Sequence, residues 1–287
     1  MKTLILKSPA KINLYLKIEG KRSDGYHDIS TLFERISIYD YITFKTTTSD
    51  KIKVYCDNPL VPNGAANFAF IAAKLLREDF ASACGVEINI KKNIPVAAGL
   101  GGGSSNAAYV LLGLNRLWGL KLTKKVIIEY AKKIGADVSF FVNNKSFAIG
   151  TERGDNIRPL NIKKVLWHVL VVPDLAVSTR GTYQEYKEDL RLTKPVFNTT
   201  IITRILSKGK LLDIEPFIYN DLERVTIKRY RRIRKIINTL RDLGSISGMS
   251  GSGPTVFGIT STRAKAEKIK GSVDKIKGVR VIVVRTF

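Results

Sequence analysis

Apolar and polar positions alternate near the start of the chain, and the pattern predicts a β-strand. Every second residue from Ile12 to Ile18 is aliphatic, while Lys11 and Asn13 fall on the opposite face. A period of two is typical of a strand that is buried on one side only. Further apolar stretches at 29–38 and 41–44 predict more strands. A sheet therefore begins in this part of the chain.

Helical patterns follow the first strands. Apolar residues recur at intervals of three and four over 67–76, and residues 107–118 are rich in helix formers. A third segment, 124–134, stops at Gly135. These patterns predict three helices. Alternation returns at 86–90, which we interpret as a strand between the first two helices.

A polar stretch at 153–164 interrupts the pattern, and we place a domain boundary within it. This gives an N-terminal domain, 1–158, and a C-terminal domain, 159–287. The second domain opens on a strong strand at 165–172 and ends on a strand at 279–284, which alternatively returns to the first domain. Strands and helices are mixed in both halves, so we expect an α+β or α/β architecture.

Composition and charge narrow the function classes. Among 287 residues, 44% are hydrophobic and 25% are charged, which is ordinary for a globular protein and argues against disorder. The net charge of +23 favours a phosphate-bearing substrate or a polyanionic partner. Cys56 and Cys84 are too few for a disulfide framework, and no apolar run has membrane-spanning length. We therefore expect a cytoplasmic protein without a membrane partner.

A glycine-rich segment between the strand at 86–90 and the helix at 107–118 is the clearest chemical signal. Its residues are Pro95, Val96, Ala97, Ala98, Gly99, Leu100, Gly101, Gly102, Gly103, Ser104 and Ser105. Consecutive glycines let the backbone approach an anion, and the start of the next helix offers free N–H groups. The pattern favours phosphate binding over a plain turn. A hydroxyl of Ser104 or Ser105 is a candidate ligand for Mg²⁺.

Isolated polar residues are weaker candidates. A lysine on a strand, such as Lys11, is usually solvated. Asp137 has the position of a helix cap or turn residue, but it runs into Phe140 and Phe141, where desolvation makes a charge consequential. His168 lies in an apolar strand and is interpreted as a core histidine with a hydrogen-bond partner.

Two turns carry further candidates. Tyr26 and His27 follow an Asp-Gly turn, where a functional pair and surface residues are equally good interpretations. A second glycine-rich turn, 248–254, is either a tight turn or a support for the phosphate loop.

Taken in order, these motifs resemble the GHMP small-molecule kinases. The segments 9–14, 95–107 and 248–257 carry that resemblance. Segments 24–27 and 135–141 are similar to one branch of the family, whose acceptor is a cytidine diphosphate-linked methylerythritol of the non-mevalonate isoprenoid pathway. Ser139 and Ser178 stand where this branch commonly has proline.

The resemblance implies a two-domain α+β fold, with an N-terminal domain like domain 2 of ribosomal protein S5 and a ferredoxin-like C-terminal domain. It implies transfer of the γ-phosphate of ATP, with Mg²⁺, to the 2-hydroxyl of the acceptor. Lys11 and Asp137 would be the catalytic pair, and the segment from Pro95 to Ser105 the ATP loop. The substrate pocket would be lined by Asn13, Tyr26, His27 and Tyr183.

Two alternatives remain. Another GHMP kinase, of the mevalonate, diphosphomevalonate or homoserine type, fits less well, because Tyr26, His27 and Tyr183 suit a cytosine ring. An RNA-binding protein is suggested by eight basic residues between Arg224 and Arg241. An amphipathic helix with a solvated basic face explains them better, so we expect no nucleic-acid partner. The assembly is expected to be a monomer or a homodimer.

Overall fold

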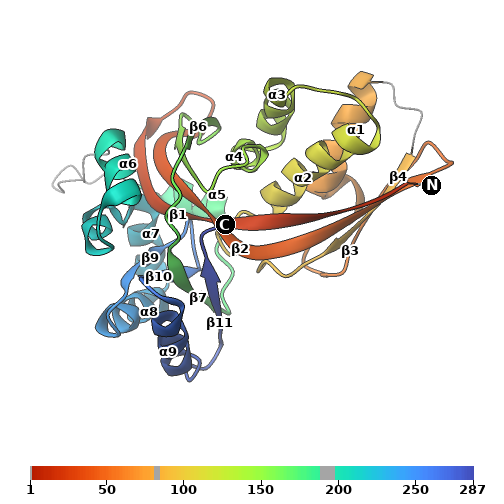
Figure 1. Ribbon diagram of the computed structural model, residues 1–287. Coiled ribbons are helices and arrows are strands. Elements are labelled where there is room, and N and C mark those ends of the chain that lie inside the picture. The colour runs from red at the N-terminus through yellow and green to blue at the C-terminus, as the bar shows by residue number, and fades with distance from the viewer. Residues whose placement is uncertain (1, 81–84, 188–197) are drawn as a thin grey trace.

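The computed structural model describes residues 2–80, 85–187 and 198–287. Cys84 lies outside these residues. The described chain forms two sheets with helices packed against each (Figure 1), which confirms the expected two-domain α+β architecture. In this part of the chain, no helix is long and apolar enough to cross a bilayer.

Sheet A has seven strands and is built around two long antiparallel strands, β1 and β2. The stretches predicted at 29–38 and 41–44 are both part of β2. The strand order is β3-β4-β2-β1-β8, and β5 pairs with both β2 and β6. The strands are β1 (Thr3–Lys21), β2 (His27–Thr47), β3 (Ile52–Cys56), β4 (Gly85–Lys91), β5 (Phe147–Thr151), β6 (Asn156–Leu160) and β8 (Tyr219–Asn220).

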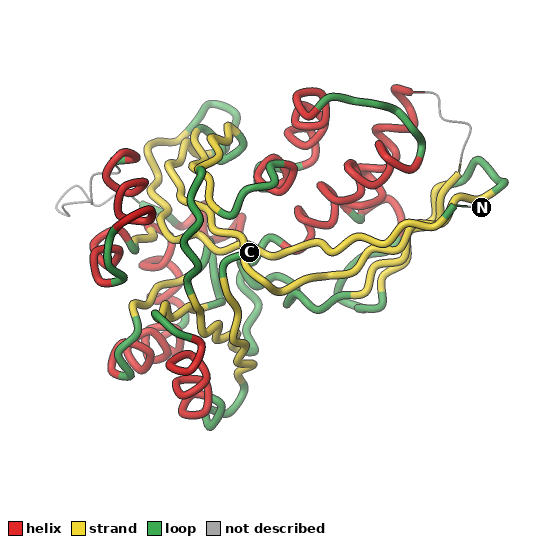
Figure 2. Tube along the Cα trace, viewed as in Figure 1, coloured by secondary structure: helices red, strands yellow, loops and turns green. Residues whose placement is uncertain are grey.

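In chain order, four helices and a 3₁₀ turn lie between β3 and β5 of sheet A. Figure 2 shows α1 and α2 lined along one side of the long strands, where alanines of both helices pack on apolar residues of β2 and β4. The helical elements are η1 (Gly64–Ala66), α1 (Phe68–Phe80), α2 (Gly102–Leu117), α3 (Lys124–Ile134) and α4 (Val138–Val142). The predicted helices at 67–76 and 124–134 are confirmed. Asn67 accepts a hydrogen bond from the N–H of Ala69 (2.9 Å) at the start of α1.

Sheet B is antiparallel, with the order β11-β7-β10-β9. Its strands therefore lie in the order fourth, first, third, second, and helices connect the first to the second and the third to the fourth. This βαββαβ arrangement is ferredoxin-like, as expected. The elements are β7 (Trp167–Pro173), α5 (Thr179–Glu185), α6 (Thr199–Lys208), η2 (Leu212–Phe217), α7 (Asp221–Arg229), α8 (Arg231–Asp242), β9 (Ile246–Met249), β10 (Val256–Thr260), α9 (Arg263–Val273) and β11 (Val279–Arg285).

The final strand joins sheet B rather than returning to the first domain. β11 pairs with β7 over seven positions, whereas its contact with β2 is limited to one β-bridge, Ile36 to Thr286, and a few hydrogen bonds at the end of the chain. Residue 158 falls inside β6, so we propose that the division between domains lies between Leu160 and Trp167, where the chain passes from one sheet to the other.

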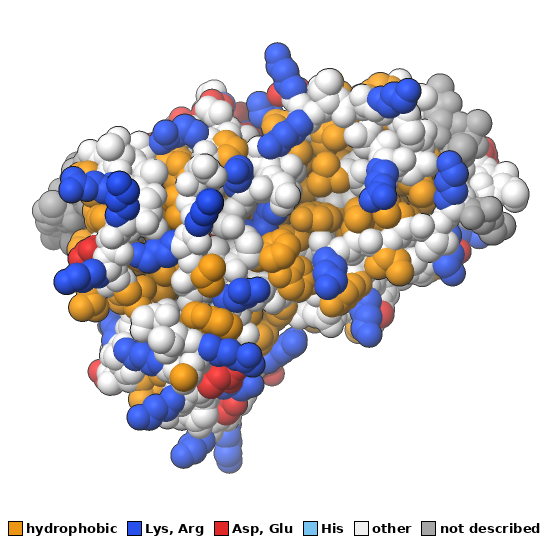
Figure 3. Space-filling model, in the orientation of Figure 1, with side chains coloured by type: hydrophobic (Ala, Val, Ile, Leu, Met, Phe, Trp, Pro, Cys, Tyr) orange, Lys and Arg blue, Asp and Glu red, His pale blue; other side chains and the backbone are white. Residues whose placement is uncertain are grey.

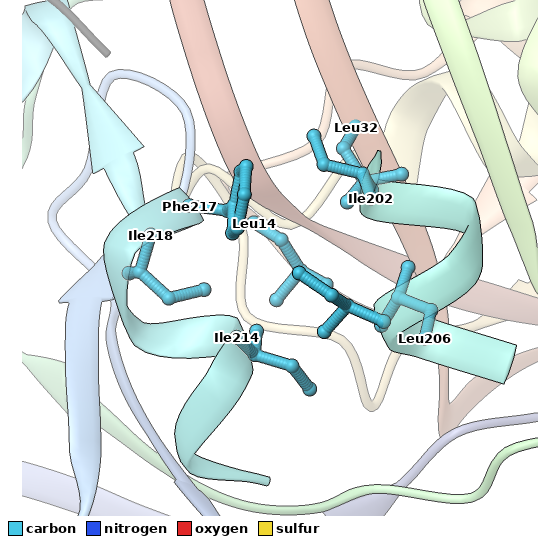
Figure 4. A pocket seen from close by; sticks show the side chains of 8 residues that line it. Leu14, Leu32, Ile202, Leu206, Ile214, Phe217 and Ile218 are labelled. Carbon is cyan, nitrogen blue, oxygen red and sulfur yellow. The ribbon is translucent and has the colours of Figure 1, made fainter. Parts of the chain in front are cut away.

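Alternate residues of β7 explain how the two halves pack together. Val169 and Val171 face the cluster that contains the helices α8 and α9, whereas Leu170 belongs to a cluster shared with Ile12 and Leu14 of β1. α6 and η2 close this shared cluster from the side, against Leu14 and Leu32 (Figure 4). The apolar core is therefore continuous across the two sheets.

His168 is a buried histidine with a hydrogen-bond partner, as predicted. Its Nε2 lies 2.8 Å from Oε1 of Glu34 in β2, and both side chains are fully buried. The same oxygen accepts a hydrogen bond from the hydroxyl of Thr286 (2.6 Å). One carboxylate therefore joins β2 to β7 and to the residue after β11.

We expect Glu34→Ala to destabilise the protein by at least about 2 kcal/mol, because two buried donors lose their acceptor and each loss costs about 1–3 kcal/mol. Urea unfolding measures this difference. Glu34→Gln, which keeps an acceptor oxygen, should retain most of the stability. A Glu34→Ala protein as stable as the wild type would show that this contact contributes nothing.

The basic segment 224–241 covers the last part of α7 and then α8 as far as Arg241, with Tyr230 between the two helices. Ile233, Ile236, Ile237 and Leu240 of α8 are buried, and the basic residues lie at other positions of the helix, together with Asn238, Thr239 and Asp242. The amphipathic-helix interpretation is therefore confirmed. Lys and Arg side chains are also scattered over the visible face of the molecule (Figure 3).

Candidate active site

Lys11 and Asn13 are buried in the middle of β1, where two irregularities flank them. The register with β2 shifts between Pro9 and Ala10 and again between Asn13 and Tyr15. Such irregularities bend a strand and re-aim its side chains. Lys11 Nζ donates to Asn13 Oδ1 at 2.6 Å, and Asn13 Nδ2 donates to Thr31 Oγ1 at 2.8 Å. The lysine is therefore held by a chain of polar contacts.

The prediction that this strand is buried on one side only is wrong over residues 8–16, all of which are buried. Lys11 is 4% exposed and Asn13 is 3% exposed. Periodicity could not reveal this, because the second face of β1 is covered by the glycine-rich loop. The N–H of Lys11 donates to the carbonyl of Leu100 in that loop (3.0 Å).

Asp137 faces the lysine from the start of α4. Its Oδ2 lies 3.2 Å from Lys11 Nζ, and its side chain is one-third exposed. Although Asp137 has the N-cap position of α4, its side chain makes no capping hydrogen bond. The carboxylate points instead toward the lysine. The structure therefore brings together the two residues proposed as the catalytic pair.

The glycine-rich loop joins β4 to α2. Ala97, Gly99 and Gly101 all have positive φ, at 52°, 74° and 68°. α2 begins at Gly102, five residues before the predicted start, and no side chain caps its first turn. The N–H groups of that turn remain available to an anion, where the helix dipole adds positive potential. The glycines are required by the packing, because a Cβ on Gly101 would come within 3.0 Å of Lys11 Cγ.

The second glycine-rich turn supports the loop, which settles the alternatives that the sequence left open. The hydroxyl of Ser250 donates to the carbonyl of Gly99 (2.9 Å) and lies 3.3 Å from the N–H of Asn13. Asn220 Nδ2 donates to the carbonyls of Met249 and Gly251 (2.8 and 2.7 Å) and fixes the turn. Residues far apart in the chain thus form the walls of one site.

Gly99→Ala is expected to weaken ATP binding at least about tenfold, because a shift of a few tenths of an ångström disrupts anion contacts of this kind. A Cβ at this position would lie 2.3 Å from the carbonyl oxygen of Ser250, so loop and turn must separate. Equilibrium binding of a non-hydrolysable ATP analogue measures the effect. Gly119→Ala is the matched control, since its φ of +66° imposes the same strain with no atom within 4 Å. Equal affinity in both variants would show that the contact is unimportant.

Of the two serines considered for Mg²⁺, one already has a hydrogen-bond partner in the protein. Ser105 is fully buried, and its hydroxyl lies 2.7 Å from that of Ser8. Ser104 is partly exposed in the first turn of α2. Among the described residues, no group of three or more His, Cys, Asp or Glu side chains could hold a metal.

A buried polar network lies under the loop, and the sequence patterns did not predict it. Asp40 is fully buried and forms an ion pair with Lys92. Its other oxygen accepts the N–H groups of Asn93 and Ile94, at 2.8 and 2.9 Å. Asn106 of α2 donates to the same carboxylate (3.0 Å). This network fixes the chain on both sides of the loop. The only sequence signal was an aspartate inside a strand pattern.

The aromatic candidates divide into two groups. The rings of His27 and Tyr183 lie 5.3 Å apart, with 32° between their planes. Tyr183 belongs to α5, whose N-cap Ser178 accepts the N–H of Gly181 (3.1 Å). Tyr26 is 58% exposed, and its ring contacts Arg153 rather than Tyr183. Of the aromatic candidates, the structure therefore pairs His27 with Tyr183.

Electrostatics link the aromatic pair to the catalytic pair. Burial, and then the charge of Asp137, raise the pKa of the Tyr183 hydroxyl, so Tyr183 lies in the field of the carboxylate. Burial, followed by the charge of Lys21, lowers the pKa of His27. His27 is therefore neutral at neutral pH, with one ring nitrogen as donor and the other as acceptor.

Comparison with known proteins identifies the family of the chain. The GHMP kinases N terminal domain family matches residues 67–145 and the GHMP kinases C terminal family matches residues 203–279. A 4-diphosphocytidyl-2-C-methyl-D-erythritol kinase from Geobacter metallireducens is 41% identical over 288 residues, covering 100% of both chains. Another from Geobacillus sp. is 39% identical over 284 residues, 97% of each chain.

Solved structures with the same fold include a kinase of the same name. A crystal structure of 4-(cytidine 5'-diphospho)-2C-methyl-D-erythritol kinase matches with a TM-score of 0.82 and 29% identity, covering 98% of this chain and 99% of that one. A homoserine kinase from Cytophaga hutchinsonii has a TM-score of 0.77 at 17% identity and shares the fold.

Fold, glycine-rich loop and family matches together define an ATP-dependent small-molecule kinase of the GHMP class. Within that class, the chain belongs to the 4-diphosphocytidyl-2-C-methyl-D-erythritol kinase family.

Proposed function

We propose that the protein transfers the γ-phosphate of ATP to the 2-hydroxyl of 4-diphosphocytidyl-2-C-methyl-D-erythritol, giving the 2-phosphate and ADP in non-mevalonate isoprenoid biosynthesis. The observation that carries this proposal is the Lys11–Asp137 pair, 3.2 Å apart. The pair lies beside a loop whose glycines suit a phosphate, and the Asp137 charge contributes to the raised pKa of Tyr183, which packs on His27.

Residues 95–105 bind the ATP phosphates in this proposal. The uncapped first turn of α2 presents N–H groups, and these neutralise part of the negative charge on the phosphates. Mg²⁺ supplies further neutralisation when it is bound, and Ser104 is the hydroxyl placed to contact it.

Asp137 orients the acceptor hydroxyl and accepts its proton, while Lys11 stabilises the carboxylate and the charge that develops on the transferred phosphoryl group. A lysine ammonium has three donors. Asn13 takes one and Asp137 lies within reach of a second, so the third serves a phosphate oxygen. Phosphoryl transfer requires little more of a protein than such positioning and charge stabilisation.

Asn13, Tyr26, His27 and Tyr183 line the acceptor pocket in this proposal. Neutral His27 can both donate to and accept from the edge of a cytosine, and Tyr183 offers a ring for stacking. Asn13 also holds Lys11 in place. We place the reaction in the cytoplasm, and we expect the protein to be a monomer or a homodimer.

Mg²⁺-dependent ADP release is the decisive assay, with the cytidine compound, mevalonate and homoserine supplied as separate acceptors. We expect turnover with the cytidine compound alone. Turnover with mevalonate or homoserine instead would reassign the acceptor within the GHMP class. No turnover with any of the three, despite ATP binding, would overturn the proposed substrate.

A further inference from the structure

Arg153 covers the ring of Tyr26 at the edge of the proposed acceptor pocket. The guanidinium carbon lies 5.3 Å from the ring centroid, within the range of a cation–π contact. Tyr26 is still 58% exposed, so the ring remains open to solvent where the guanidinium does not cover it. A tyrosine supported on one side and open on the other is suited to stack a flat ligand.

The guanidinium is itself held in place. Nε of Arg153 donates to Oδ2 of Asp155 at 3.1 Å, and Nη2 contacts the same oxygen. The Asp155 side chain is 5% exposed and that of Arg153 is 31% exposed. A buried carboxylate that engages two nitrogens restricts the guanidinium far more than a surface pair does. Arg153 is therefore a fixed support and not a free surface side chain.

The turn that carries Arg153 is fastened to the strand that carries His27. The N–H of Ile29 in β2 donates to the carbonyl of Glu152 (2.7 Å). Gly154 closes the turn with a bond from its N–H to the carbonyl of Thr151 (2.9 Å). A Cβ on Gly154 would come within 3.1 Å of Ile29. The β5–β6 turn thus has a fixed position relative to the start of β2.

The backbone of Tyr26 is fixed as well. Its N–H donates to Oδ1 of Asp24 (3.0 Å), and its carbonyl accepts the N–H of Arg22 (2.9 Å). With the backbone fixed, rotation of the side chain is the remaining freedom of Tyr26. The contact with Arg153 restricts that rotation.

We propose that Arg153 is a positioning residue for acceptor binding, which acts by holding the Tyr26 ring as a platform for the pyrimidine base. The proposal rests on the proposed function, in which Tyr26 lines the acceptor pocket. Arg153 does not contact the reacting atoms. Its removal therefore affects recognition of the base and leaves the chemical step intact.

The test measures dissociation constants of cytidine and of cytidine diphosphate by calorimetry, together with KM and kcat for the acceptor. For Arg153→Ala we expect both ligands to bind about tenfold more weakly, the magnitude of a well-placed cation–π contact. KM for the acceptor should rise to the same extent, with kcat and KM for ATP unchanged. Arg153→Lys, which keeps the charge without the planar group, should recover part of the loss.

Arg158→Ala is the matched control, since this exposed arginine lies on β6 of the same hairpin. We expect this substitution to leave the dissociation constants, KM and kcat unchanged. In a double-mutant cycle, Tyr26→Ala/Arg153→Ala should bind no more weakly than Tyr26→Ala alone. Additive losses of affinity in the double variant would overturn the proposal that Arg153 supports the Tyr26 platform. Weaker binding of cytidine diphosphate with unchanged binding of cytidine would also overturn it, because Arg153 would then be a phosphate contact.

An Arg153→Ala protein that binds both ligands normally would also overturn the inference. The proposed function would survive that result as long as the wild type turns over the acceptor. A wild type that neither binds cytidine compounds nor turns over the acceptor would overturn both.

Discussion

Asp137→Asn should lower kcat by about 10²–10⁴-fold, the contribution expected of a residue that takes part in proton transfer. The carboxylate lies 3.2 Å from Lys11 Nζ and is one-third exposed, so it can reach both the lysine and an incoming hydroxyl. An amide fills the same space but cannot accept the proton. KM for ATP should remain within a few-fold of the wild-type value. Steady-state ADP release at saturating substrates measures the change.

The control for Asp137→Asn is Asp174→Asn, which removes one negative charge from an exposed turn after β7 and should leave kcat unchanged. A loss confined to the KM for ATP would place Asp137 among the nucleotide contacts. Near-normal kcat in Asp137→Asn would remove the residue from the mechanism.

Lys11→Met should lower kcat/KM by at least about 10²-fold, in line with the loss of a buried charge that stabilises the transition state. Methionine approximates the length of the side chain at this 4% exposed position, so packing is largely kept. What is lost is the positive charge near Asp137 and the donor to Asn13 (2.6 Å). The measurement is the initial rate of ADP release over a range of acceptor concentrations.

Lys7→Met is the matched control for Lys11→Met, because Lys7 is an exposed residue of the same strand. If the two catalytic residues act as a unit, Lys11→Met/Asp137→Asn should be about as slow as the slower single variant. Rates that multiply in the double variant would show two independent contributions. A Lys11→Met enzyme within a few-fold of the wild type would contradict the assignment.

Local patterns were sufficient to predict most elements of the fold. The alternation in β1, the apolar spacing of α1 and the loop between β4 and α2 each depend on neighbouring residues, and each is present in the structure. The start of α2 was misplaced by five residues, because glycine and serine are poor helix formers. Gly102 and Gly103 nevertheless belong to the helix, despite their low intrinsic propensity.

Burial at the site could not be predicted from one strand at a time. Lys11 was expected to face solvent, but the loop around Leu100 and the turn at Ser250 cover it. Asp40 and Glu34 are likewise buried, against partners that are distant in the sequence. Long-range contacts of this kind produce no periodic pattern of apolar and polar residues in the sequence. The ordered motifs compensated, since they identified the family and led to the proposed catalytic pair.

The contact between Ser250 and Asn13, which are 237 residues apart, has a consequence for biogenesis. A ribosome adds about 5–20 residues per second, so roughly 12–50 s separate the synthesis of the two residues that flank the nucleotide loop. ATP can stabilise only a chain that already has both of them in place. A site that needs both residues therefore cannot form on the nascent N-terminal half, and the nucleotide stabilises the chain only after the turn at Ser250 has been synthesised.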